Sequence, residues 1–204
     1  MPSLYLVRHG VAQDAEGRAL GWTDRPLAPE GRARIAELAA TWNGPPPSRC
    51  WTSDLLRTRE TAAILGARWH TLIEPEPRLR EMHFGEWDGR SWTELEAADG
   101  VRLAAWMADW STAGTPGGEG WPDLLARVAE WCGELRAAAE QGGGPLLVVG
   151  HAGSLRALLG VLLDLSAAAL FKLRIERGAV TEMTLGGRGA ELVGLNLPTF
   201  PAAV

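Results

Sequence analysis

Long apolar runs are missing from the sequence. None approaches the ~20 residues that cross a bilayer, and the N-terminus lacks the basic, apolar and small-residue order of a secretory signal. We therefore expect a cytoplasmic protein with no membrane partner. Cysteine is scarce as well, and the spacing of Cys50 and Cys132 matches no metal-ligand pattern. Both are expected to be buried free thiols.

Positive charge is also sparse. The chain has 20 Lys and Arg residues against 25 Asp and Glu residues, a net charge of −5, and no basic block. This balance argues against nucleic acid as a partner. An anionic substrate would have to be attracted by a local group of arginines, because the overall field is weakly repulsive. No cluster of carboxylates is present to hold a metal ion, so we expect neither a metal nor another cofactor.

Short apolar runs alternate with helical patterns along the 204 residues, a length that suits one domain. The run at 146–150 shows no polar alternation, which is typical of a strand buried on both faces of a parallel sheet. We predict an α/β fold, a three-layer α/β/α sandwich with a mostly parallel central sheet, over residues 1–204. The predicted strands are 4–7, 48–52, 72–73 and 146–150, with further candidates at 171–177, 180–185 and 190–195.

Tryptophan is unusually frequent, with ten residues beside one tyrosine and three phenylalanines. Trp87, Trp92, Trp106 and Trp110 all lie within residues 78–120, which interrupt the alternation of strands and helices. We expect this excursion to consist of loop and short helix and to cover the functional site.

Two predicted strands end in a histidine, His9 after the first and His151 after the fourth. Ligands of open α/β sheets bind beyond the carboxyl ends of the strands, so both histidines are expected at that edge. Arg8 adjoins the first, and Arg57 lies in the first turn of the helix that follows the second strand, where anions are favoured. Each histidine alone is more often structural, and Arg57 alone would pair with a carboxylate such as Glu60. Their combination indicates an oxyanion site.

Further motifs follow the segment LYLVRHG at residues 4–10 in a fixed order. They are Gly21-Trp22 with Pro26-Leu27, Glu30-Gly31, Ser53-Asp54-Leu55 with Arg57-Thr58 and Thr61-Ala62, Glu81 with Phe84-Gly85, and Gly150-His151. This ordered set covers nearly the whole chain and resembles the histidine phosphatase superfamily, whose fold is called phosphoglycerate-mutase-like. The three residues Arg8-His9-Gly10 alone would be weak evidence for this family.

The resemblance implies a metal-independent phosphomonoester hydrolase acting on a small phosphorylated metabolite. His9 would be the nucleophile that forms a phosphohistidine, with its ring held in one tautomer. Arg8, Arg57 and His151 would line the phosphate pocket, and Glu81 would protonate the leaving oxygen. Without the resemblance, Glu81 would be read as a loop carboxylate paired with a neighbouring arginine.

Two positions depart from the family pattern. Many members carry a hydroxyl residue four positions after the motif arginine and an asparagine seven positions after it, where this chain has Ala12 and Ala15. Either Gln13 or Asp14 replaces their contacts with phosphate, or the phosphate has fewer neutral donors. These departures put catalytic efficiency in question more than the type of reaction.

The segment from Glu81 to Trp87, together with later tryptophans and Gly118-Glu119-Gly120, is similar to the α-ribazole-5'-phosphate phosphatases of cobalamin assembly. Trp106 and Trp110, one helical turn apart, would either pack in the core or stack on an aromatic leaving group. Trp22 is a further candidate contact with substrate. The preferred substrate is therefore α-ribazole 5'-phosphate.

Other interpretations remain open from sequence alone. A broad-specificity phosphatase shares parts of the same segment. A cofactor-dependent phosphoglycerate mutase is disfavoured by Met82 and Phe84, which replace an arginine and a tyrosine that hold its substrate. A catalytically weak domain that binds phosphorylated ligands has Ala12 and Ala15 as its support. The oligomeric state, including a homodimer, is left open.

Overall fold

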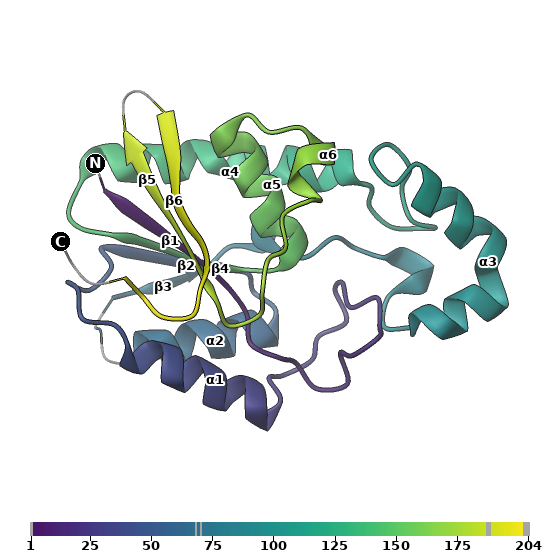
Figure 1. The fold of residues 1–204 in the computed structure, drawn as a ribbon, viewed down its shortest axis with the longest axis horizontal. Helices are drawn as coiled ribbons and strands as arrows, with labels where there is room; N and C mark the ends of the chain where they lie inside the picture. The colour runs from purple at the N-terminus through teal and green to yellow at the C-terminus, as the bar shows by residue number, and fades with distance from the viewer. Residues whose placement is uncertain (1, 68, 70, 187–188, 202–204) are drawn as a thin grey trace.

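The computed structural model describes residues 2–67, 69, 71–186 and 189–201. Its sheet has the strand order β3-β2-β4-β1-β5-β6 (Figure 1). The first four of these strands run parallel, and β5 and β6 are antiparallel to their neighbours. The bounds are β1 Ser3–Arg8, β2 Arg49–Thr52, β3 Ile73–Pro75, β4 Leu146–Gly150, β5 Val180–Gly186 and β6 Gly189–Leu197.

Helices cover both faces of this sheet, with α1 and α2 on one side and α4 and α5 on the other (Figure 1). The bounds are α1 Pro29–Ala40, α2 Leu56–Gly66, α3 Trp92–Ala108, α4 Trp121–Gln141, α5 Ala152–Leu163 and α6 Ala167–Leu170. The prediction of an α/β sandwich with a mostly parallel sheet is confirmed. None of the helices in the described ranges combines the length and apolar character needed to cross a bilayer.

The central strand β4 is buried along its whole length. Its side chains contribute to two hydrophobic cores, one on each face of the sheet. Leu146 and Val148 pack with the apolar faces of α4 and α5, whereas Leu147 and Val149 pack with α1 and α2. This alternation follows from the period of two in a strand, and burial of both faces explains the continuous apolar run. Cys50 and Cys132 are buried and free, as predicted.

The excursion contains more helix than we predicted. Its helix α3 has 17 residues, with a kink at Asp99. The helix begins at a capping box in which Ser91 and Glu94 bond to each other's backbone N–H. Trp87 is fully buried in a small separate core and donates its indole N–H to Asp99. Ser91 followed three residues later by Glu94 is a sequence signature of a helix start, so this helix could have been predicted from the sequence.

Two of the closing strand candidates are confirmed as β5 and β6, but residues 171–177 form no strand. Phe171 ends α6, and the chain then makes a turn in which Gly178 has a φ of 63°. This segment crosses the carboxyl edge of the sheet, where its carbonyl at Ile175 accepts a hydrogen bond from Arg8. Residues 171–177 therefore serve as a connection and not as a strand.

Candidate active site

The two strand-end histidines lie side by side. His9 follows β1 and His151 follows β4, and Arg8 and Gly150 are paired across these parallel strands. The backbone N–H of His9 donates to the carbonyl of Gly150, and the two ring centroids are 5.0 Å apart. The parallel register thus brings together residues far apart in sequence, as we predicted.

One nitrogen of the His9 ring is committed to the backbone. His9 is 5% exposed, and its Nδ1 lies 2.6 Å from the carbonyl oxygen of Gly10. Because a carbonyl only accepts, Nδ1 carries the proton and Nε2 carries the lone pair. Burial lowers the pKa of His9 well below its ordinary value of 6.5, and the charges of Arg57 and Arg8 lower it further. The ring is therefore neutral, with a basic nitrogen.

The ring of His151 has the opposite tautomer. Nε of Arg57 donates to Nδ1 of His151 over 3.2 Å, so that nitrogen must be unprotonated. Nε2 then carries the proton and donates to the hydroxyl of Ser53 over 2.9 Å. Burial, and after it the charge of Arg57, lowers the pKa of His151 well below the ordinary value. Both ring nitrogens of His151 are thus engaged.

Arg57 is fully buried and does not pair with Glu60, which instead pairs with Arg32 at 2.7 Å. Besides His151, its guanidinium donates to the carbonyls of Gly21 and Thr23. These bonds use three of the five guanidinium N–H groups. Burial lowers the pKa of Arg57 to about 10, so the group is still charged at neutral pH.

Arg8 has an unused donor. Its terminal nitrogen bonds to Ile175, but its buried Nε has no hydrogen-bond partner within the described ranges. Burial, and after it the positive charge of nearby Arg177, lowers the pKa of Arg8 to about 10. Because an unpaired buried donor is costly, Arg8 and Arg57 together form a site that favours an oxyanion.

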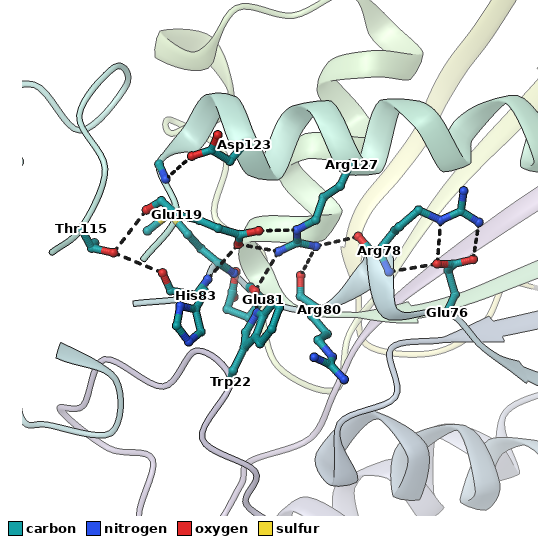
Figure 2. A network of polar contacts seen from close by, with 12 residues as sticks. Trp22, Glu76, Arg78, Arg80, Glu81, His83, Thr115, Glu119, Asp123 and Arg127 are labelled. Atoms are coloured by element: carbon teal, nitrogen blue, oxygen red, sulfur yellow. Dashed lines mark hydrogen bonds and ion pairs between the residues drawn. The ribbon is translucent and has the colours of Figure 1, made fainter. Parts of the chain in front are cut away.

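Glu81 extends toward the start of α5, next to His151. Its carboxylate accepts from the backbone N–H of Met82 at 2.9 Å and of Gly153 at 3.1 Å. Neither neighbouring arginine binds it, since Arg78 pairs with Glu76 and Arg80 pairs with Asp54. Figure 2 shows Glu81 beside Arg80, and Arg78 bonded to Glu76. The simple alternative of a loop ion pair is therefore wrong.

An apolar cavity of about 210 Å³ adjoins Glu81 and Gly153. Aromatic side chains from four separate segments form much of its wall, namely Phe84, Trp106, Trp110, Trp121 and Phe171. Trp110 lies beyond the end of α3, so the predicted spacing of one helical turn on a common helix face is wrong. Both predicted tryptophans nevertheless line the cavity, and Arg156 adds one positive charge to its wall.

Trp22 and Gln13 are the remaining predicted contacts with substrate. Trp22 donates its indole N–H to the carbonyl of Glu81 and packs under the guanidinium of Arg80, so it supports the Glu81 backbone. Gln13 is exposed, and among the described residues its side chain forms no hydrogen bond. Ala12 and Ala15 are both buried. Within the same residues, no group of three His, Cys, Asp or Glu side chains is placed to hold a metal ion.

Several supporting residues were not among the predicted site residues. The hydroxyl of Ser53 accepts the hydrogen bond from Nε2 of His151. The carboxylate of Asp88 accepts the backbone N–H groups of residues 21–23 and so holds the loop that Arg57 contacts. Arg156 donates to the carbonyl of Leu173 at the edge of the cavity. Their roles depend on contacts between distant segments.

The opposite tautomers give a direct test. In isotope-labelled protein, nuclear magnetic resonance should show His9 protonated at Nδ1 and His151 protonated at Nε2. Because both pKa values lie well below 6.5, both rings should stay neutral as the pH falls through 6.5. His9→Gln and His151→Gln variants would assign the signals. A shared tautomer, or titration of either ring near 6.5, would contradict this geometry.

Comparison with known proteins identifies this arrangement. Residues 4–198 match the profile of the histidine phosphatase superfamily, branch 1. The chain belongs to this superfamily. The resemblance found in the sequence motifs is thereby confirmed, and it extends over nearly the whole chain.

Several of the similar proteins are named as phosphatases. The chain is 32% identical over 194 residues to adenosylcobalamin/alpha-ribazole phosphatase of Salmonella typhimurium, which covers 95% of both chains. It is 35% identical over 173 residues to glucosyl-3-phosphoglycerate phosphatase of Mycobacterium tuberculosis, covering 81% of this chain and 77% of the relative. The crystal structure of alpha-ribazole phosphatase from Shigella flexneri is 26% identical, with a TM-score of 0.91 over 99% of this chain and 100% of the other. The chain is a phosphatase of this superfamily.

Proposed function

We propose that the phosphatase acts through a phosphohistidine on His9. Nε2 of His9 attacks phosphorus, the bond from phosphorus to the leaving oxygen breaks, and Glu81 gives that oxygen its proton. Water then attacks the phosphohistidine, Glu81 takes a proton from it, and the N–P bond breaks to release phosphate. The observation that carries this proposal is the free lone pair of His9 beside two guanidinium groups with unused donors.

His9 is favoured over His151 as the nucleophile by its hydrogen bonds. Both nitrogens of His151 are engaged by Arg57 and Ser53, whereas no hydrogen bond reaches Nε2 of His9 within the described part of the chain. Arg8 and Arg57 would balance the charge on the phosphoryl oxygens as the phosphorus–oxygen bond breaks. Their positive charges are permanent at neutral pH, so this mechanism needs no metal ion.

We further propose α-ribazole 5'-phosphate, an intermediate of cobalamin assembly, as the substrate. It carries a flat apolar base at the end opposite the phosphate, and the aromatic cavity begins at Glu81, the proposed acid. Stacking of a base on aromatic side chains contributes ~1–3 kcal/mol per base. The names of the relatives from Salmonella and Shigella agree with this assignment. The proposed site of action is the cytoplasm.

A second candidate substrate is glucosyl-3-phosphoglycerate. Arg156 lies in the wall of the same cavity, where its guanidinium could bind the carboxylate of such a substrate. The mycobacterial relative is named for this activity. Phosphoglycerate mutase chemistry has less support, because Met82 and Phe84 line the cavity in place of the arginine and tyrosine that hold the substrate of such mutases.

Substrate preference tests the assignment. We expect kcat/KM for α-ribazole 5'-phosphate to exceed that for 3-phosphoglycerate by at least ~10-fold, which requires ~1.4 kcal/mol of differential transition-state binding. Trp110→Ala should reduce this ratio toward one. Trp69→Ala removes a partly buried tryptophan that packs in the core on the α1 and α2 side, so it should leave the ratio unchanged.

The measurement is a steady-state comparison on a panel of phosphomonoesters. It should include glucosyl-3-phosphoglycerate, phosphoserine and p-nitrophenyl phosphate. A preference for glucosyl-3-phosphoglycerate would select the second candidate, and comparable rates on all esters would indicate a broad-specificity phosphatase. Either result would reject α-ribazole 5'-phosphate and leave the phosphohistidine chemistry standing.

A further inference from the structure

The guanidinium of Arg127, in the second turn of α4, uses all of its N–H groups. Its Nε and one terminal nitrogen donate to the two carboxylate oxygens of Glu119 at 2.8 and 2.9 Å. The remaining donors reach the carbonyl oxygens of Arg78 at 2.6 Å, Arg80 at 2.8 Å and Glu81 at 2.9 Å. Figure 2 shows this fan of contacts below the helix. Only an arginine has five donors in a fixed plane.

The carboxylate of Glu119 binds the backbone that follows Glu81. One of its oxygens also accepts the backbone N–H of His83 at 2.9 Å. The backbone N–H of Glu119 donates to the carbonyl of His83 at 2.8 Å, and the hydroxyl of Thr115 lies 3.2 Å from that carbonyl. The ion pair thus fixes the backbone immediately before and after Glu81.

This support matters because no regular structure holds Glu81. The short helical turn Pro77–Leu79 ends before it, and residues 80–84 belong to no helix or strand. The side chains of Arg127 and Glu119 are only 16% and 19% exposed, so water does not readily replace their contacts. Removing one partner would leave the other charge poorly compensated.

The carboxylate of Glu81 has little room to move on the side that faces α5. A Cβ added at Gly153 would lie 2.0 Å from a carboxylate oxygen of Glu81. The carboxylate is therefore pressed against the first turn of α5, next to His151. A catalytic group in such a position is sensitive to movement, since a displacement of about 1 Å can reduce a rate by about 10²-fold.

We propose that Arg127 and Glu119 are a positioning pair that sets the place of Glu81 for proton transfer. This inference rests on the proposed function of Glu81 as the general acid. The side chains of the pair bond to each other and to the backbone around Glu81, and we assign them no contact with substrate. Its effect on the rate should therefore depend on Glu81 and on the leaving group, and not on the attack by His9.

The test compares leaving groups. We expect Arg127→Met to lower kcat for an alkyl phosphate by about 10- to 100-fold, with KM nearly unchanged. Formation of the phosphoenzyme from p-nitrophenyl phosphate should change less than about 3-fold, because that leaving group needs little protonation. In a Glu81→Gln background, Arg127→Met should cause almost no further loss, since residues that act through one group are not additive.

Arg78→Met is the matched control. Arg78 pairs with Glu76, Glu130 and Glu134 in the same region, but its side chain contacts no residue from 79 to 83 in the hydrogen-bond network. Arg78→Met should therefore leave the dependence of the rate on the leaving group unchanged. If Arg127→Met fails to fold, Arg127→Lys and Glu119→Gln provide the same readout, because each keeps part of the network.

Two outcomes would overturn the inference. Equal losses on both substrates, or losses that add fully to those of Glu81→Gln, would mean that the pair stabilises the fold only. The result for Glu81→Gln alone separates the two proposals. If the loss of rate in Glu81→Gln depends on the leaving group and the loss in Arg127→Met does not, the positioning role is wrong and the proposed function stands. If Glu81→Gln shows no such dependence, both are wrong.

Discussion

We expect His9→Ala to lose at least about 10⁴-fold in kcat/KM, because removing the nucleophile of a covalent mechanism leaves only binding and electrostatic stabilisation. The fold should persist, since His9 follows the end of β1 and, among the residues that the structure describes, its ring makes one hydrogen bond, to the adjacent Gly10. Thermal unfolding would confirm that the variant is folded.

The intermediate itself is the decisive measurement. Rapid acid-free quenching of the enzyme with radiolabelled substrate should trap a phosphoenzyme that is stable in base and labile in acid. His9→Ala should give none, whereas His151→Ala should still give some, because the attacking nitrogen is intact. Label on serine or aspartate, or a phosphoenzyme formed by His9→Ala, would reject the mechanism.

The positions of the two histidines could be predicted from sequence because the argument is local. Each follows a short buried strand, and parallel strands meet at one edge of a sheet. The chain has a net charge of −5. Arg8 and Arg57 nevertheless both lie close enough to His9 for their positive charges to lower its pKa. That local excess of positive charge was also expected from the strand-to-helix junctions, and the structure agrees.

The partners of these residues could not be predicted. Arg57 donates to the carbonyls of Gly21 and Thr23, whose loop is held by Asp88 from the excursion. No propensity or period in the sequence specifies a contact between segments so far apart. The same holds for Arg127, which reads in sequence as an ordinary exposed position on an amphipathic helix.

The aromatic cavity shows a mixed result. Trp106 and Trp110 were expected to act together and both line it, but they do so from a helix and from the loop beyond it. Trp121 and Phe171 complete the wall from other segments. Residues 171–177, predicted as a strand, are the connection that brings Phe171 there. A short run that contains some apolar residues does not by itself separate a strand from a connection that packs against its neighbours.

The leaving group decides how strongly Glu81 matters. For an alkyl phosphate, the departing oxygen is a poor leaving group and needs a proton in the transition state. We expect Glu81→Gln to lower kcat/KM for such a substrate by about 10²- to 10⁴-fold. The glutamine amide can still accept the N–H of Gly153 but has no acidic proton to give.

With p-nitrophenyl phosphate, the phenolate leaves without help, so phosphoenzyme formation by Glu81→Gln should fall by less than about 10-fold. Stopped-flow release of nitrophenolate measures this step apart from hydrolysis of the intermediate. That second step should still be slow in the variant, because the attacking water then lacks its base, and a burst of nitrophenolate should become visible. Equal losses on the two substrates without a burst would mean that Glu81 only binds or supports the site, and that the proton comes from another group.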